Sequence, residues 1–293
     1  MKTDKRTGKR IDISYIVIVA VLLIWFVIII YPFYNAILIS LVSSTDYIKN
    51  PFMLIPPKLS FTSYAQLLRG PAVWVGLKNT FMILLFGLPL NLLLTSSMAY
   101  AFSRKHFPLK KTLFVLVVFT MFFSGGMVPT FLVVKSLGLI NKLASIVLLY
   151  GINTFYMILA KSYFESIPES VEESATIEGA NDVTILFKIM LPLAKPILAT
   201  TALFYLVDRW NEWFYSTLFI MSGNTMPLQV IVRRIVVFTV NEFIQSGYAL
   251  DEFIFAPGIK MAAIIISMVP IMFVYPFMQR YFTKGIMIGA IKG

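Results

Sequence analysis

The stretch "LVDRWNEWFY", residues 206–215, places four strongly polar side chains inside a long apolar segment. Asp208, Arg209 and Glu212 can carry charge, and Asn211 can donate and accept hydrogen bonds. A charge against lipid costs roughly 2.5–3.5 kcal/mol at the centre of a span, so these groups are expected to face a water-filled interior or one another. We predict that Arg209 pairs with Asp208 or with a carboxylate on a neighbouring helix. Structural pairing and a direct part in a solute pathway both stay open.

The two tryptophans of this stretch, Trp210 and Trp213, lie three residues apart on one helix face and are suited to stack on sugar rings. Tryptophan also anchors spans at the membrane interface, and we favour that role for Trp213. Smaller polar groups interrupt other apolar stretches, where helix packing is the alternative to solute contact. The candidate pathway residues are Asn91, Ser96, Asn153, Asp208, Arg209, Trp210, Asn211, Glu212 and Trp213. We also expect Gly125, Gly126 and Pro129 to unwind their span locally.

The composition excludes several kinds of site. The chain has no cysteine and one histidine, His106, which sits in the basic turn "SRKHFPLKK", so thiolate chemistry and histidine metal clusters are excluded. The carboxylates form no metal motif. No "GxxxxGK[ST]" sequence is present, because "TGKR" at 7–10 lacks the first glycine and the final Ser or Thr. We therefore expect no metal and no cofactor bound by this chain, and no enzyme activity.

A second polar segment, "ESVEESATIEGANDVTILFKIMLPLAKP" (169–196), lies between two apolar stretches. Ser166, Pro168 and Glu169 predict a helix from about residue 167 that opens with a capping box. Glu169, Glu172, Glu173 and Thr176 share one face, and Ile167, Val171 and Ala175 share another. Gly179 is expected to end this helix in the left-handed conformation, Asp182 to cap a second helix and Pro192 to stop it.

The acidic face of this segment indicates what it contacts. An amphipathic helix lying on lipid carries basic residues, whereas glutamates are repelled by anionic headgroups. We therefore predict that the segment docks against a protein partner.

The elements that position these residues are membrane helices. Of the 293 residues, 58% are hydrophobic and 13% are charged, which is typical of a bilayer protein. Six stretches have the roughly 20 apolar residues that a span needs: 13–42, 80–102, 112–134, 143–164, 196–220 and 260–282. We expect an all-α membrane protein in which a tail, 1–12, precedes a single transmembrane domain, 13–293, that contains a loop at 166–192. The first apolar run is too long for a cleavable signal peptide.

Basic residues predict the orientation of these spans. With the N-terminus inside, inner segments hold fifteen Lys and Arg and outer segments hold nine, so both termini and the 166–192 loop are expected in the cytoplasm. The net charge of +11 is explained in the same way, and no nucleic-acid partner is expected. Two outer segments are long: the first has a proline-rich turn region and a short helix "FTSYAQLLRG" ending at Gly70, and the second, 221–258, is expected to be irregular or helical over the pore mouth.

The segment "ESATIEG" (173–179), nine further residues and "IMLP" (189–192) resemble the EAA loop of permease subunits in binding-protein-dependent ABC importers, with Ser174 in place of the usual alanine. The resemblance extends to "FSGGMVPTFLVVKSLGLINK", "WNEWF", "MPLQVIVRR" and "YFTKGIMIGAIKG", which are similar to maltose-type second permeases, nearest the polysaccharide and alginate importer group. In that family the loop is the coupling helix that seats in the ATPase, so the resemblance implies this role for Glu173, Ala175 and Gly179. The candidate coupling residues are Glu172, Glu173, Ala175, Thr176, Gly179, Asp182 and Pro192.

The resemblance also implies a fold and a set of partners. It implies a type I importer permease in a bacterial cytoplasmic membrane, with a second permease, two ATPase subunits that use ATP and Mg, and an external solute-binding protein. The substrate would be an oligosaccharide. Two explanations stay open for Arg233, Arg234, Lys49 and Lys58: they favour an acidic substrate by electrostatic steering, or they are ordinary solvated cations of outer loops. The alternatives are an ion-coupled secondary transporter that uses Asp208 and Glu212, and an intramembrane enzyme. An enzyme needs a nucleophile and base or a metal set, whereas the one histidine lies in a loop and the carboxylates form no metal motif.

Overall fold

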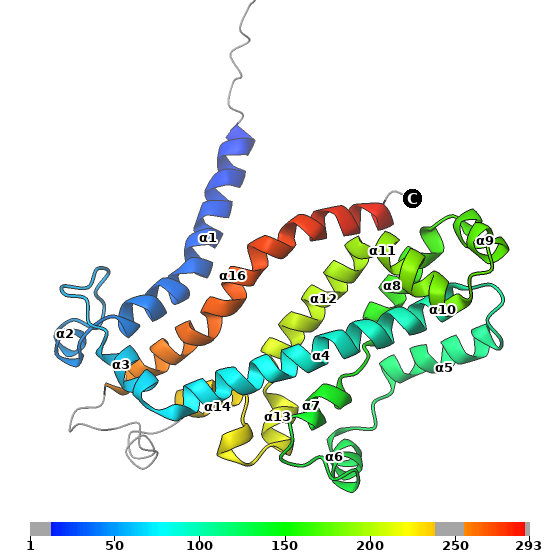
Figure 1. Ribbon diagram of the computed structural model, residues 1–293. Coiled ribbons are helices and arrows are strands. Elements are labelled where there is room, and N and C mark those ends of the chain that lie inside the picture. Colours follow the sequence, from blue (N-terminus) through cyan, green and yellow to red (C-terminus); the bar gives the residue numbers. More distant parts are fainter. Residues whose placement is uncertain (1–12, 238–254, 291–293) are drawn as a thin grey trace, which may run out of the picture. The chain divides into compact units, whose positions relative to one another are not determined.

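The computed structural model describes residues 13–237 and 255–290, and these residues are helical, with no β-strand among them (Figure 1). This confirms the all-α class for the described residues. The predicted tail 1–12 and residues 238–254 of the second long outer segment lie outside them. The helices are α1 (Ile13–Ser40), α2 (Ser44–Lys49), α3 (Thr62–Arg69), α4 (Pro71–Ser103), α5 (Lys110–Phe122), α6 (Met127–Ser136), α7 (Ala144–Leu149), α8 (Thr154–Ser166), α9 (Glu169–Ile177), α10 (Asp182–Ile185), α11 (Leu191–Leu193), α12 (Lys195–Trp210), α13 (Phe214–Phe219), α14 (Leu228–Val237) and α16 (Ala256–Ala290).

Three of the described helices, α1, α4 and α16, are long and apolar enough to cross a membrane. Two further spans are possible if each of two bent pairs is one span: α5 with α6, bent by 113°, and the α10–α11 segment with α12, bent by 84°. A continuous helix was expected over 196–220, but α12 ends at Trp210 and α13 covers Phe214–Phe219, so the structure differs there. The stretch 143–164 is likewise divided, between α7 and α8. The predicted unwinding near Gly126 is confirmed, since its φ of +84° suits glycine and ends one helix before the next begins.

The chain forms two compact units, and the first comprises residues 1–67 and 240–265. Its small core contains Leu38, Val42 and Met53, against which Tyr47 and Phe255 pack. The predicted helix near 61–70 is confirmed as α3. Gly258 is required by close approach, because a Cβ there would lie 2.4 Å from the Ser63 Oγ of α3. Most side chains of α1 are exposed and apolar, as expected for a helix surrounded by lipid or by another chain.

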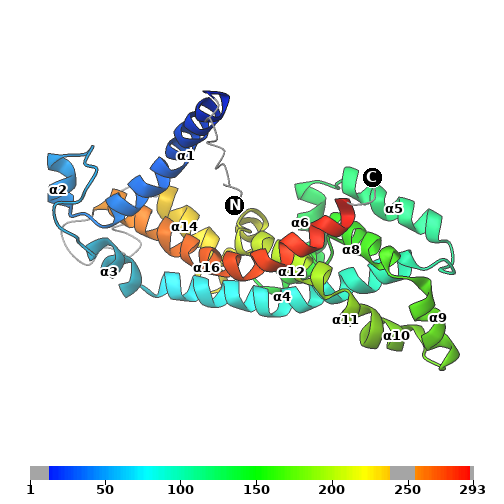
Figure 2. The same ribbon diagram turned by 90° about the horizontal axis from the view of Figure 1, so that it is seen from above.

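The second unit comprises residues 68–239 and 266–293, and α4 is its central element. This helix packs against α8, α12 and α14 (Figures 1 and 2). Gly76 allows α14 to approach closely, since a Cβ at this position would lie 3.0 Å from the Leu228 Cα. Because α4 contacts elements from three later parts of the sequence, it can hold polar residues of all three in fixed positions.

Candidate functional sites

The segment predicted to dock, which we call the elbow (residues 166–192), is a helix, a turn and a second, irregular helix. Its first helix, α9, begins at Glu169 and not near 167. The predicted capping box is wrong: Ser166 is the last residue of α8 and donates its hydroxyl to the Tyr163 carbonyl at 2.7 Å. Pro168 is the N-cap residue, and no side chain caps the helix. A side chain that is already inside one helix cannot cap the next.

Gly179 ends α9 as predicted. Its φ of +86° is left-handed, and a Cβ there would meet nothing within 4 Å, so the backbone conformation alone selects glycine. The Gly179 N–H donates to the Thr176 carbonyl at 2.9 Å, and the Ala180 N–H donates to the Ala175 carbonyl at 3.0 Å. These two bonds form a Schellman motif, which satisfies the last carbonyls of α9 and fixes the direction of the following chain.

The second half of the elbow departs from the prediction at both ends. Asn181, not Asp182, is the N-cap residue, and its side-chain oxygen accepts from the Thr184 N–H at 2.8 Å. Asp182 is instead the first residue of α10. Pro192 does not stop the helix: a π-helical turn (Leu186–Met190) widens the coil, and Pro192 then lies in the first positions of α11, where its missing N–H is tolerated. The chain bends only after Ala194.

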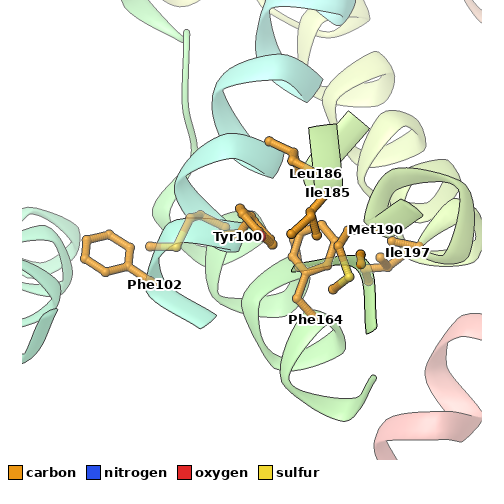
Figure 3. Packing of buried hydrophobic residues seen from close by; sticks show 12 residues of the cluster. Tyr100, Phe102, Phe164, Ile185, Leu186, Met190 and Ile197 are labelled. Carbon is orange, nitrogen blue, oxygen red and sulfur yellow. The ribbon is translucent and has the colours of Figure 1, made fainter. Parts of the chain in front are cut away.

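The base of the elbow is fixed by an apolar cluster between α4, α8, α9 and the π-helical turn (Figure 3). Ala175 is 5% exposed within it, so the predicted apolar face of α9 is confirmed. Tyr100 and Phe164 pack edge to face at 6.1 Å between ring centroids. Burial of apolar side chains stabilises this junction by about 25 cal/mol per Å². Any movement of α9 must therefore move α4 and α8 with it or break the packing.

A half-buried ion pair also joins α9 to the end of α4. Arg104, directly after α4, pairs with Glu172, and the two side chains are 18% and 22% exposed. Glu172 also accepts from the Tyr100 hydroxyl at 3.1 Å, and Arg104 donates to the Ser103 hydroxyl at 2.9 Å. Burial is the main cause that lowers the pKa of the Arg104 guanidinium. Glu172 thus faces inward, away from the surface that the sequence assigned to it.

The outer surface of the elbow remains open. Glu173 and Thr176 are exposed, and no ion pair to Glu173 is present among the described residues. Ile177 is 87% exposed and Val183 is 65% exposed. Glu169 forms a surface pair with Lys105 at 2.8 Å, and the hydrogen bond from Lys105 holds the pKa of this carboxyl below its ordinary value. An acidic tip with protruding apolar residues is suited to dock on a protein surface of complementary charge.

The second site is a polar cluster in which Arg209 lies at the centre. Arg209 is 3% exposed, and its guanidinium donates to the Asn91 side-chain oxygen at 3.2 Å and to the Tyr150 carbonyl. Asn91 donates to the carbonyls of Tyr150 and Gly151, at 2.6 and 2.8 Å. The guanidinium also lies 4.5 Å from the centroid of the Tyr150 ring. The arginine therefore has neutral partners and no carboxylate partner among the described residues.

The predicted pairing of Arg209 with Asp208 or another carboxylate is wrong, because both nearby carboxylates are used elsewhere. Asp208 is exposed and accepts from the Tyr156 hydroxyl at 2.8 Å. Glu212 accepts from the Tyr150 hydroxyl, and its other oxygen accepts from the Tyr215 N–H at 2.7 Å, which caps α13. Asp208 and Arg209 are adjacent on α12 and point in different directions, and Glu212 lies beyond the end of α12 at Trp210, so each meets a different neighbour.

The other candidate pathway residues divide by exposure. Asn91, Ser96 and Trp210 are buried; Trp210 donates to the Ser267 carbonyl at 2.9 Å, and Ser96 donates to the Leu92 carbonyl at 2.5 Å. The side chain of Asn153 caps α8. Asp208, Asn211 and Trp213 are exposed.

Several residues of these sites were missed by sequence reasoning. They are Tyr100, Arg104, Tyr150, Tyr156 and Tyr205. Tyr205, for example, is buried, and its hydroxyl bonds Thr95 at 2.6 Å and accepts from the Asn153 N–H at 2.8 Å. Within an apolar span, a tyrosine that packs in the core and a tyrosine that hydrogen-bonds across helices have the same sequence pattern. Only the polar partner, which lies far away in the sequence, tells the two apart. Among the described residues no group of three His, Cys, Asp or Glu could hold a metal ion.

The fold and the two sites define a multi-helix membrane component with a surface elbow, and comparisons with known proteins identify its class. Residues 79–288 match the family described as "Binding-protein-dependent transport system inner membrane component", and the chain belongs to this family. The resemblance read from the sequence is therefore confirmed.

Individual relatives are similar over nearly their whole length. The polygalacturonan/rhamnogalacturonan transport system permease protein YtcP of Bacillus subtilis (strain 168) is 38% identical, with 93% of this chain and 96% of that protein covered. Protein LplC of the same organism is 35% identical over 89% of each chain. A crystal structure of a bacterial ABC transporter involved in the import of the acidic polysaccharide alginate contains a chain with a TM-score of 0.86 and 31% identity, over 96% of this chain and 100% of that one. The chain therefore has the type I ABC permease fold of that importer.

Proposed function

We propose that this chain is one of two permease subunits in an ATP-driven bacterial importer, and that the pair forms the path of an oligosaccharide through the cytoplasmic membrane. It would act with a second, homologous permease, two ATPase subunits and a solute-binding protein. In this assignment the chain is not an enzyme and holds no cofactor, while ATP and Mg act in the ATPases. The single observation that carries the proposal is the elbow, whose base is packed into the bundle and whose acidic and apolar tip is open.

The elbow is built to pass force between a partner and the bundle. Ala175 and its apolar neighbours fix one side of α9, while Glu173, Thr176 and Ile177 remain exposed on it. The chain has no phosphate-binding motif, so energy from ATP would have to reach it through another protein. A contact at the tip would move α4 and α8 as well as α9, because the base does not separate without loss of packing.

The contacts within the second unit support the proposed orientation of six spans with cytoplasmic termini in one permease domain, 13–293. Arg104 of one predicted inner segment contacts Glu172 of another. Asn79 of the first outer segment donates to the carbonyls of Asn224 and Met226 in the last one, at 3.0 and 3.1 Å. Segments that are assigned to one side of the membrane thus meet each other.

The proposed substrate is an acidic oligosaccharide. Two of the similar proteins are named for polygalacturonan and rhamnogalacturonan transport and for alginate import, and both names denote uronate polymers. In this chain Arg233 and Arg234 are exposed in a predicted outer segment. Cations at the mouth of a path raise the local concentration of an anionic solute.

Co-purification tests the proposal. The chain is expressed with its candidate partners, solubilised and captured, and the bound chains are identified by peptide sequencing. We expect two ATPase subunits and a second permease with the wild type. Glu173→Lys should release the ATPases and keep the second permease, and Glu173→Gln should release them less completely, because it removes the charge without reversing it. Uptake in liposomes by this chain alone, driven by an ion gradient, would instead support a secondary transporter.

A further inference from the structure

An exposed arginine is stacked on an exposed tryptophan in the second unit. The guanidinium carbon of Arg233, on α14, lies 3.6 Å from the centroid of the Trp213 ring, and Trp213 is 39% exposed. No carboxylate among the described residues lies within ion-pair distance of Arg233. An arginine facing lipid is costly, so this exposed charge must meet water, another chain or an anionic ligand.

The arginine stands on a fixed platform. The opposite face of α14 is buried through Leu228, Ile231 and Ile235, each 5% exposed or less. The Leu228 N–H donates to the Thr80 hydroxyl of α4 at 2.9 Å, which fixes the start of α14 on α4. A group on a rigid element loses little conformational entropy when it binds a ligand.

The tryptophan is fixed as well. Trp213 is the N-cap residue of α13, and Glu212 caps this helix by accepting from the Tyr215 and Ser216 N–H groups at 2.7 and 3.1 Å. The same carboxyl accepts from the Tyr150 hydroxyl. The backbone at Trp213 is therefore held by α13 and, through Glu212, by Tyr150 at the end of α7.

The stacked pair combines two kinds of recognition. A guanidinium stacked on an indole keeps its N–H edges free, and these edges match a carboxylate in bidentate geometry. The exposed part of the indole offers an apolar surface to the carbon face of a pyranose ring. A sugar that carries a carboxylate is the ligand that uses both surfaces at once.

We propose that Arg233 and Trp213 form a subsite for one uronate residue of the transported oligosaccharide, with Arg233 binding the carboxylate and Trp213 the ring. This inference rests on the proposed import function and names the residues that make import selective for acidic over neutral oligosaccharides. Arg234 is the neighbouring exposed cation, and no aromatic or carboxylate contact to it is present in the described residues, so it contributes charge only.

The test uses the assembled importer in proteoliposomes with its binding protein and ATP. Uptake of a galacturonate oligosaccharide is compared with uptake of its methyl ester, which has the same ring and no charge. Because the binding protein is the same throughout, differences between variants report on this chain. Arg233→Gln should lower the ratio of acid to ester uptake about tenfold or more, the usual value of a charged bidentate contact. Arg234→Gln, the matched control, should change the ratio less than about twofold, in line with a solvent-screened charge.

Two further variants keep the test decisive. Arg233→Lys retains charge but loses the planar edge, so its ratio should fall between those of wild type and Arg233→Gln. Trp213→Leu should lower uptake of acid and ester alike, because both have the ring. Equal ratios for Arg233→Gln and Arg234→Gln, or an unchanged ratio in Arg233→Lys and Arg233→Gln, would overturn the subsite. If the wild-type complex moves neither acid nor ester with ATP, the import function itself fails.

Discussion

Gly179 shows how one backbone conformation can matter to a whole assembly. Its φ of +86° is unfavourable for other residues, yet a Cβ would touch nothing, so substitution strains the turn without a clash. Gly138 is a matched control, with φ of +66° and the same open surroundings, at the end of α6 and away from the elbow. The two positions therefore separate local strain from a loss of coupling.

We expect Gly179→Ala to lower solute-stimulated ATP hydrolysis by the assembled complex severalfold, and Gly138→Ala to leave it near the wild-type rate. A left-handed alanine costs roughly 1–2 kcal/mol, which corresponds to a roughly 5–30-fold smaller population of the native turn. The measurement is the hydrolysis rate with and without loaded binding protein, at equal amounts of complex. Equal rates for both variants would remove Gly179 from the coupling path.

Single residues were predictable from the sequence only when their neighbours in the chain determine them. Gly179 and Ala175 belong to one helix and its end, and both were placed correctly. The partners of Arg209 were not: Asn91 is 118 positions away, and Tyr150 is 59 positions away. The choice between Asn91 and a carboxylate depends on how three helices pack, which hydropathy does not encode.

At the scale of elements, the pair Arg104–Glu172 connects α9 to the end of α4, beside the apolar cluster. A charge-assisted hydrogen bond in a half-buried pair is worth about 1.5–3 kcal/mol. The neighbouring pair Lys105–Glu169 joins the same two segments, but its side chains are 72% and 56% exposed. Solvent and salt screen such exposed pairs, which contribute little to stability, so this pair is a control in the same turn.

Arg104→Gln should therefore reduce the number of solute molecules moved per ATP hydrolysed, whereas Lys105→Gln should leave this ratio near its wild-type value. The reason is that α9 would still seat on the ATPase but would be less firmly linked to α4. The double variant Arg104→Glu with Glu172→Arg restores opposite charges and should recover part of the ratio. Uptake and hydrolysis are measured on the same proteoliposomes. An unaltered ratio in Arg104→Gln would mean that apolar packing alone carries the movement.

The elements themselves were partly predictable. Apolar length identified α1, α4 and α16, and glycine and proline indicated the break between α5 and α6. The break before α12 was expected at Pro192 but lies at Ala194, because the π-helical turn that accommodates the proline has no simple sequence mark. The N-cap of α10 was likewise assigned to the wrong residue, Asp182 instead of Asn181, because both residue types cap helices.

At the scale of the whole molecule, the absence of cysteine makes the topology and the docking directly measurable. Any introduced cysteine is unique in the chain. Ile177 in the elbow is 87% exposed and Ile48 in α2 is 70% exposed, so both are open to reagents. The proposed topology puts them on opposite sides of the membrane, so Ile48→Cys is the control for Ile177→Cys.

The most direct test of a force-receiving elbow is cysteine cross-linking at Ile177 in the assembled complex. We expect Ile177→Cys to cross-link to an ATPase subunit and to resist a membrane-impermeant maleimide added to intact cells, while Ile48→Cys is labelled under the same conditions. Labelling of Ile177→Cys from outside, or no cross-link to the ATPase in a complex that hydrolyses ATP, would contradict the proposed role of the elbow.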